Sequence, residues 1–188
     1  MKKSIVAHFS LCLAVMFVFL AFPSSFCAQN LSLTDVIVNN SRRDLLAYFN
    51  VRNSFDDETR QALLNGVTVR LIFDIRLFQV RDLWPDVLLA ALNLEHSIRY
   101  DALKEEFLVD LDGKKYRLKE LPKAQSLVSE VSGLSVSPLS KLASNRTYEL
   151  QIKAARKKDP TPSVFSYIIS MLSFWDTETD DYSVEFRY

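Results

Sequence analysis

Alternating apolar and polar residues between positions 67 and 77 form the strongest pattern in the chain. In the stretch VTVRLIFDIRL, every second residue from Val67 to Leu77 is apolar, and most residues between them are polar. This period of two is typical of a β-strand that buries one face. After Leu77 the alternation changes phase, because Phe78 and Val80 become the apolar positions. We therefore predict a β-bulge or bend near residues 77 and 78.

The same alternation recurs in shorter segments, which we also predict to be strands. Residues 107–118 (FLVDLDGKKYRL) indicate a β-hairpin, because the pair Asp112-Gly113 suits a tight turn with positive φ. Residues 31–39 and 44–51 are expected to form another antiparallel pair. Further strands are predicted at residues 92–100, 148–154 and 182–188.

Two helices are predicted between these strands. Residues 54–66 (SFDDETRQALLNG) begin with a capping pattern, Ser54 followed by Asp57, and end at a glycine. Residues 121–133 (LPKAQSLVSEVSG) carry a proline in the first turn, and Gly133 is the expected stop.

A third helix is predicted at residues 162–175, where serines form one stripe and bulky apolar residues occupy the other positions. A shorter helical turn is expected to begin at Pro85. Together the elements predict a mainly β (α+β) fold, an antiparallel β-sandwich or strongly curved sheet with two to three inserted helices. Because no repeat or linker is visible, residues 29–188 are expected to form a single β-rich domain.

Residues 1–28 have the layout of a signal peptide. Lys2 and Lys3 precede an unbroken apolar run, and a small-residue region follows, with cleavage expected after Cys27 or Ala28. The alternative is an uncleaved anchor, because the apolar run approaches the roughly twenty residues that span a bilayer. Both alternatives predict an exported protein, periplasmic and either soluble or tethered to the inner membrane. A bacterial envelope is favoured because both cysteines, Cys12 and Cys27, lie in the leader.

Charge and composition exclude several classes of function. The chain has 23 basic and 23 acidic residues, and two basic ones lie in the leader, so the mature protein would carry about −2. This balance argues against nucleic acid as a partner. Three glycines leave no glycine-rich phosphate loop. We expect no metal or cofactor, because the usual zinc sites need more histidine and cysteine than the mature chain offers.

His96 and an acidic stretch are the candidates for chemistry, and both are expected to be structural. His96 is the single histidine after the leader and shares the apolar phase of its strand, so a buried, hydrogen-bonded role is favoured over catalysis. The stretch DTETDD starts like a calcium loop, but Asp181 replaces the turn glycine and Arg187 replaces the bidentate glutamate. A solvated acidic loop is therefore expected there.

The predicted helix at 162–175 raises the question of what it packs against. Its polar stripe carries serine and no Lys or Arg, which favours packing against the protein core over a membrane surface. Contact with a membrane or a partner stays open as the alternative, because a basic run precedes the helix. The residues that would make this contact are Phe165, Ile168, Ile169, Leu172 and Trp175, and the basic run consists of Lys153, Arg156, Lys157 and Lys158.

The stretch NGVTVRLIFDIRLFQVRDLWPD resembles a bacterial exported family, the domain of unknown function 4390. The resemblance includes a helix that ends in Gly-Val, a long strand, and then Arg81, Trp84 and Asp86. A second similar stretch is IRYDALKEEFLVDLDG. The family has no established activity, and its genes are often near two-component sensor kinases of the nitrogen-regulation type. The resemblance therefore implies a periplasmic accessory to a membrane sensor.

Our first hypothesis is a non-enzymatic envelope module that binds a protein partner. The alternatives are a lipid or apolar-ligand binding protein and, least favoured, a hydrolase built on carboxylates. The residues expected to contact the partner are Arg70, Asp74, Arg76, Arg81, Trp84 and Asp86. The opposing interpretation is that these residues form an ordinary solvated sheet face beside a buried tryptophan.

Overall fold

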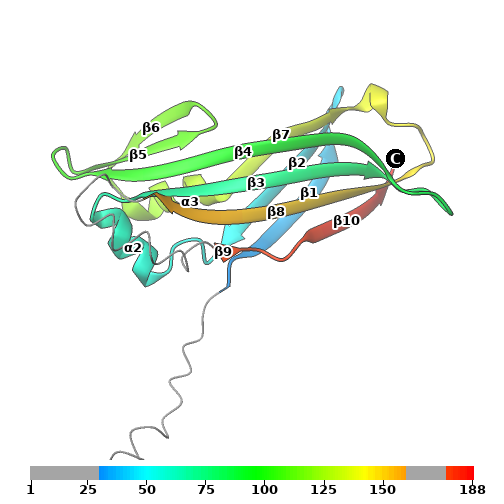
Figure 1. Cartoon of the computed structure of the whole chain (residues 1–188). Helices are drawn as coiled ribbons and strands as arrows, with labels where there is room; N and C mark the ends of the chain where they lie inside the picture. Colours follow the sequence, from blue (N-terminus) through cyan, green and yellow to red (C-terminus); the bar gives the residue numbers. More distant parts are fainter. Residues whose placement is uncertain (1–29, 160–176) are drawn as a thin grey trace, which may run out of the picture.

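The computed structural model describes residues 30–159 and 177–188, which form two antiparallel β-sheets packed on each other (Figure 1). The larger sheet has the strand order β10-β8-β3-β4-β5-β6, with β9 paired to β8, and the smaller has the order β1-β2-β7. The predicted mainly β fold with inserted helices is confirmed. The strands are β1 (Ser32–Asn40), β2 (Asp44–Arg52), β3 (Thr68–Gln79), β4 (Val87–Asp101), β5 (Glu106–Leu111), β6 (Lys114–Leu118), β7 (Glu130–Pro138), β8 (Thr147–Asp159), β9 (Thr177–Glu178) and β10 (Tyr182–Arg187).

Strand β3 lies at the centre of the larger sheet, paired with β4 and β8 along its whole length. Its alternating residues Val69, Leu71, Phe73, Ile75 and Leu77 all have no solvent exposure. Burial of each such side chain stabilises the fold by about 1.5–3 kcal/mol. The period-two pattern of the sequence therefore predicts the buried face of this strand correctly.

The predicted bulge near residues 77 and 78 is confirmed, although the partner strand supplies the extra residue. Leu77 lies opposite Ala90 and Phe78 opposite Leu88, so that Leu89 of β4 is inserted between them. The pairing of β3 with β8 continues here without a shift. The predicted helical turn at Pro85 is wrong, because pairing with β3 draws the following residues into β4 from Val87 onward.

Helix α2 (Asp57–Leu64) confirms the first predicted helix but not its cap. The N-cap is Asp56, whose side chain accepts a hydrogen bond of 2.7 Å from the backbone N–H of Thr59. Ser54 instead is buried and shares a hydrogen bond of 2.7 Å with the hydroxyl of Ser129. The carboxylate is the stronger acceptor for the N–H groups at a helix start, which explains why it takes the capping role.

Helix α3 (Leu121–Ser129) ends earlier than predicted, because β7 begins directly at Glu130. Gly133 is therefore not a helix stop and lies within β7 with φ +68°. Leu134 lies opposite Ala47 and Val131 opposite Phe49, so β7 holds one residue more than β2 between these pairs. Pairing with β2 decides the conformation here, since an isolated glycine signals a bulge as well as it signals a helix end.

The predicted hairpin at 107–118 is confirmed as β5 and β6. Asp112 and Gly113 form its turn with φ of +49° and +90°. Both residues have the positive φ of the two-residue turn that matches the twist of the flanking strands.

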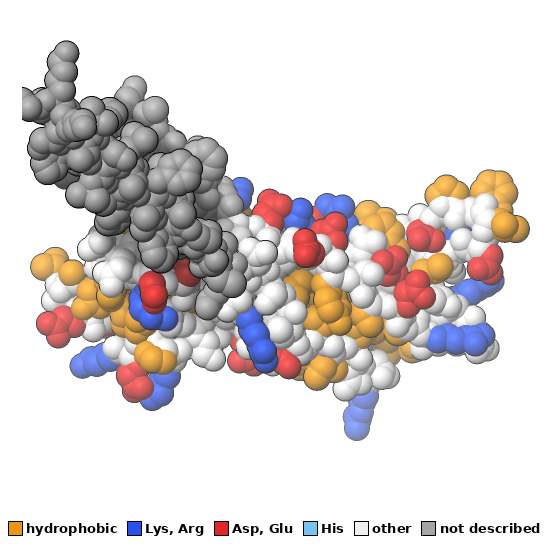
Figure 2. Space-filling view, turned by 90° about the horizontal axis from the view of Figure 1, so that it is seen from below, with side chains coloured by type: hydrophobic (Ala, Val, Ile, Leu, Met, Phe, Trp, Pro, Cys, Tyr) orange, Lys and Arg blue, Asp and Glu red, His pale blue; other side chains and the backbone are white. Residues whose placement is uncertain are grey.

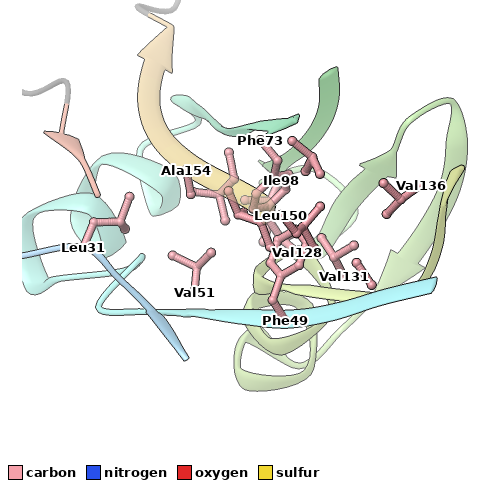
Figure 3. Close-up of a cluster of buried hydrophobic side chains, with 14 of the residues drawn as sticks. Leu31, Phe49, Val51, Phe73, Ile98, Val128, Val131, Val136, Leu150 and Ala154 are labelled. Carbon is pink, nitrogen blue, oxygen red and sulfur yellow. The ribbon is translucent and has the colours of Figure 1, made fainter. Parts of the chain in front are cut away.

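One hydrophobic core lies between the two sheets and includes one side of α3 (Figure 3). Phe49 of the smaller sheet packs edge-on against Phe73 of the larger, with ring centroids 5.5 Å apart. Val128 of α3 and Ile98 of β4 are fully buried beside them. This filled layer gives the larger sheet a buried inner face and leaves its outer face to solvent.

Candidate docking surface

The loop between β3 and β4 projects from one end of the molecule (Figure 1). Leu83 is completely exposed, the side chain of Trp84 is 73% exposed, and Leu88 at the start of β4 is 51% exposed. Figure 2 shows hydrophobic side chains gathered at this end of the molecule. The opposing interpretation of Trp84 as a buried core residue is therefore wrong. We call residues 80–86 the projecting loop.

Hydrogen bonds hold the projecting loop in a defined shape. The carboxylate of Asp86 accepts a hydrogen bond of 2.9 Å from the backbone N–H of Arg81, which closes the loop across its base. The N–H of Val80 donates to the carbonyl of Thr147 at 3.0 Å. Leu83 has φ +66°, a left-handed conformation that costs a non-glycine residue about 1–2 kcal/mol. The loop thus presents its apolar residues at the expense of local backbone strain.

Charged side chains surround the exposed Trp84. A hollow of about 400 Å³ beside it is lined by Gln79, Val80, Arg81, Asp82, Trp84 and Arg146. Tryptophan and arginine are the residue types that contribute most to binding energy in protein–protein interfaces. An apolar tip with an arginine-containing rim resembles such an interface more than a solvated turn.

The other three predicted contact residues lie on the outer face of β3. The guanidinium of Arg76 donates to both carboxylate oxygens of Asp74, at 2.5 and 3.2 Å, and Arg70 lies 3.5 Å from Glu95. The side chains of both pairs are between 32% and 53% exposed. Exposed ion pairs contribute little to stability. The six predicted residues therefore form two groups, a paired patch on the sheet face and the projecting loop at the end of the same strand.

Two residues of the basic run in β8 have different roles. Lys153 forms an ion pair of 2.7 Å with Glu178 on the exposed face. Their hydrogen bond raises the pKa of Lys153 and lowers the pKa of Glu178. Arg156 is instead buried and bonded to Asp56, so it does not belong to the exposed charges that could meet a membrane or a partner. A sequence signal existed, because Arg156 shares the phase of the buried residues Ile152 and Ala154.

His96 is buried and hydrogen-bonded, as predicted. Its Nδ1 lies 2.8 Å from the carbonyl oxygen of Val128, near the end of α3, and its ring packs against Phe73. Burial lowers the pKa of His96 below its usual value, and the Val128 carbonyl and Asp112 oppose this shift only in part. The ring is therefore neutral near pH 7.

Three further points concern the predicted helix at 162–175, metal binding and membrane-spanning helices. Phe165, Ile168, Ile169, Leu172 and Trp175 lie outside the described residues. Among residues 30–159 and 177–188, no group of acidic residues, histidine and cysteine is arranged to hold a metal ion. Within the same ranges, no helix has the length and apolar character needed to cross a bilayer.

The fold and the projecting loop define a class, a two-sheet antiparallel β protein with an exposed apolar loop at one end. The model of the family described as a domain of unknown function (DUF4390) matches residues 28–185. The chain therefore belongs to this family, as the resemblance predicts. Searches of the curated proteins and of the solved structures find no match to the chain.

Proposed function

We propose that this protein is a non-enzymatic accessory module of the bacterial envelope that binds a protein partner through the projecting loop. The single observation that carries the proposal is the pair Leu83 and Trp84, held outward on a loop closed by Asp86. Burial of these two side chains against a partner would contribute about 1.5–3 kcal/mol each. Exposed apolar side chains and a strained backbone do not stabilise the folded chain. Contact of the loop with a partner therefore explains them better than a role in folding does.

The charges around the loop support a protein surface as the partner. Arg81 and Arg146 supply cations and Asp82 an anion within one small hollow, so the rim carries both signs. A mixed rim around an apolar centre is the usual composition of a transient protein interface. An anionic membrane would favour a rim of one positive sign.

The location and the identity of the partner are part of the same proposal. The leader predicts export, and the gene setting implied by the family resemblance suggests the extracytoplasmic part of a membrane sensor kinase as the partner. Fractionation of cells that express the full-length chain, with determination of the mature N-terminus, tests the location. An N-terminus near residue 28 or 29 in the periplasmic fraction supports a cleaved leader, and retention of Met1 in the membrane supports an anchor. Recovery in the cytoplasm contradicts export.

A matched pair of variants tests the role of the loop. Leu83→Ala and Leu103→Ala both shorten a leucine that is almost completely exposed, but Leu103 lies in the turn between β4 and β5, away from the projecting loop. The proposal predicts that Leu83→Ala weakens retention of an envelope partner on the tagged protein by at least fivefold, and that Leu103→Ala leaves it unchanged. Equal retention by both variants would contradict it.

A further inference from the structure

A groove opens at another place in the fold, between β7 with the end of α3 on one side and the inner face of β4, β5 and β6 on the other. Its volume is about 450 Å³. Small-molecule sites in proteins usually occupy clefts of about 300–1,000 Å³ with mostly apolar walls and a few polar groups. The groove has this size, and its lining is mixed, with leucines beside polar and charged residues. We call it the His96 groove.

Four half-buried leucines form much of the apolar part of the His96 groove. Leu94 and Leu111 come from the larger sheet, Leu127 from α3 and Leu134 from β7. These side chains pack against the core on one side and leave their other side to the groove. The rim is polar and carries Asp112, Lys114, Tyr116 and Glu130.

His96 supplies a hydrogen-bond acceptor among these walls. Its Nδ1 faces the carbonyl of Val128 at 2.8 Å, and a carbonyl oxygen only accepts, so Nδ1 carries the proton. In a neutral ring Nε2 is then the unprotonated nitrogen. Within the described part of the chain, the Val128 carbonyl is the hydrogen-bond partner of the ring, so the lone pair of Nε2 has no donor there, and His96 lines the groove.

We propose that the His96 groove binds a small molecule that has an apolar body and one hydroxyl or N–H donor. The apolar body lies between the leucines, and the donor bonds to Nε2 of His96. A peptide strand fits this place less well, because β7 is bulged at two positions along its pairing with β2. Bulges of this kind disfavour the addition of a further strand at a sheet edge.

Phenol and toluene are the probes that test the proposal, since they share a ring and differ by the hydroxyl donor. Titration calorimetry of the purified protein is expected to show phenol bound roughly three- to tenfold more tightly than toluene, the effect of one hydrogen bond. In ¹⁵N NMR spectra, phenol should shift the Nε2 resonance of His96, and toluene should not. Equal affinities for the two probes, or no binding of either at millimolar concentration, would overturn the proposal.

Adjacent lysines of β6 provide matched variants for the location of the site. Lys114 pairs with Leu111 and lines the groove, whereas Lys115 pairs with Asp110 on the opposite face of the sheet. Lys114→Trp should weaken both probes at least tenfold by filling the groove, and Lys115→Trp should leave them within twofold. If both substitutions weaken binding equally, the probes bind elsewhere.

A third variant tests His96 itself. In His96→Asn the side-chain amide can still donate to Val128, but it has no atom in place of Nε2. The preference for phenol over toluene should fall to about one, with the affinity for toluene retained. A preference that survives would contradict the role of Nε2, and the NMR shift of the unsubstituted protein decides the question if this variant does not fold.

Discussion

The guanidinium of Arg156 donates to the carboxylate of Asp56 at 2.9 Å, and the arginine side chain is only 5% exposed. Arg156 also donates to the carbonyl oxygen of Ser54 at 3.1 Å and to the hydroxyl of Thr177 at 3.3 Å. One side chain of β8 thereby joins the segment before α2 to β9. Asn53, whose carbonyl also accepts from Arg156, donates from its side chain to the carbonyl oxygen of Asn30, so the network also reaches the segment before β1.

Loss of the Asp56 carboxylate should destabilise the protein. Asp56→Asn keeps an oxygen that can cap α2 but leaves the buried Arg156 charge without its partner, which costs about 3–5 kcal/mol in a fully buried pair. We expect up to about 3 kcal/mol here, because Asp56 itself is one-third exposed. Urea unfolding measures the change. The double variant with Arg156→Met should recover part of the loss, and a loss below about 0.5 kcal/mol would show that the pair is unimportant.

The same pair predicts how stability changes in acid. Partial burial alone would raise the pKa of Asp56, but the hydrogen bond from Thr59 and the charge of Arg156 outweigh it and lower the pKa below 3.8. A carboxyl with a lowered folded-state pKa stabilises the fold above its unfolded-state value and loses this contribution as pH falls. The difference in unfolding free energy between the unsubstituted protein and Asp56→Asn should therefore shrink below pH 3.8. A difference that stays constant down to pH 2 would contradict this assignment.

Protonation of His96 should cause a second loss of stability on acidification, in a pH range above that of Asp56. Burial lowers its folded-state pKa below 6.5, so the unfolded chain binds a proton that the folded protein does not. Stability should fall as pH decreases from 6.5 towards the folded-state value. His96→Asn should abolish this part of the pH dependence. An unchanged profile in the variant would assign the effect to another group.

Strand phase explains which parts of the structure could be predicted from the sequence. The buried residues of β3 and the phase change at Leu77 follow from local alternation, and both are confirmed. The same alternation places Arg156 on the buried face, but its charge favours an exposed assignment. The partner that makes its burial acceptable, Asp56, lies about a hundred residues away in the chain. No local pattern reveals such a partner.

Tertiary pairing explains the errors at Gly133 and Pro85. Gly133 follows a helix and Pro85 suits a helical first turn, so both signals were compatible with helix as well as strand. In the structure β2 pairs with the chain around Gly133, and β3 pairs with the residues after Pro85. The exposure of Trp84 could not be predicted either, because it depends on how Asp86 closes the projecting loop.

Asp86 is expected to act on binding through the shape of the loop. Asp86→Ala removes the acceptor of the Arg81 N–H bond, so the projecting loop should loosen and partner affinity should fall by roughly three- to tenfold. Asp86→Asn keeps an oxygen at the same position and should restore most of the affinity. Unfolding should be nearly unaffected in both variants, because the bond is exposed. Equal losses in the two variants would indicate a direct role for the carboxylate charge.

The most direct test of the proposed function places a photo-crosslinking amino acid at position 84 in growing cells, with position 103 as the control. Both positions are exposed, and only position 84 lies in the projecting loop. We predict one discrete adduct from position 84 that contains an envelope protein, is lost when Leu83→Ala is added, and is absent from position 103. The same adducts from both positions, or none from position 84, would contradict a docking role for the loop.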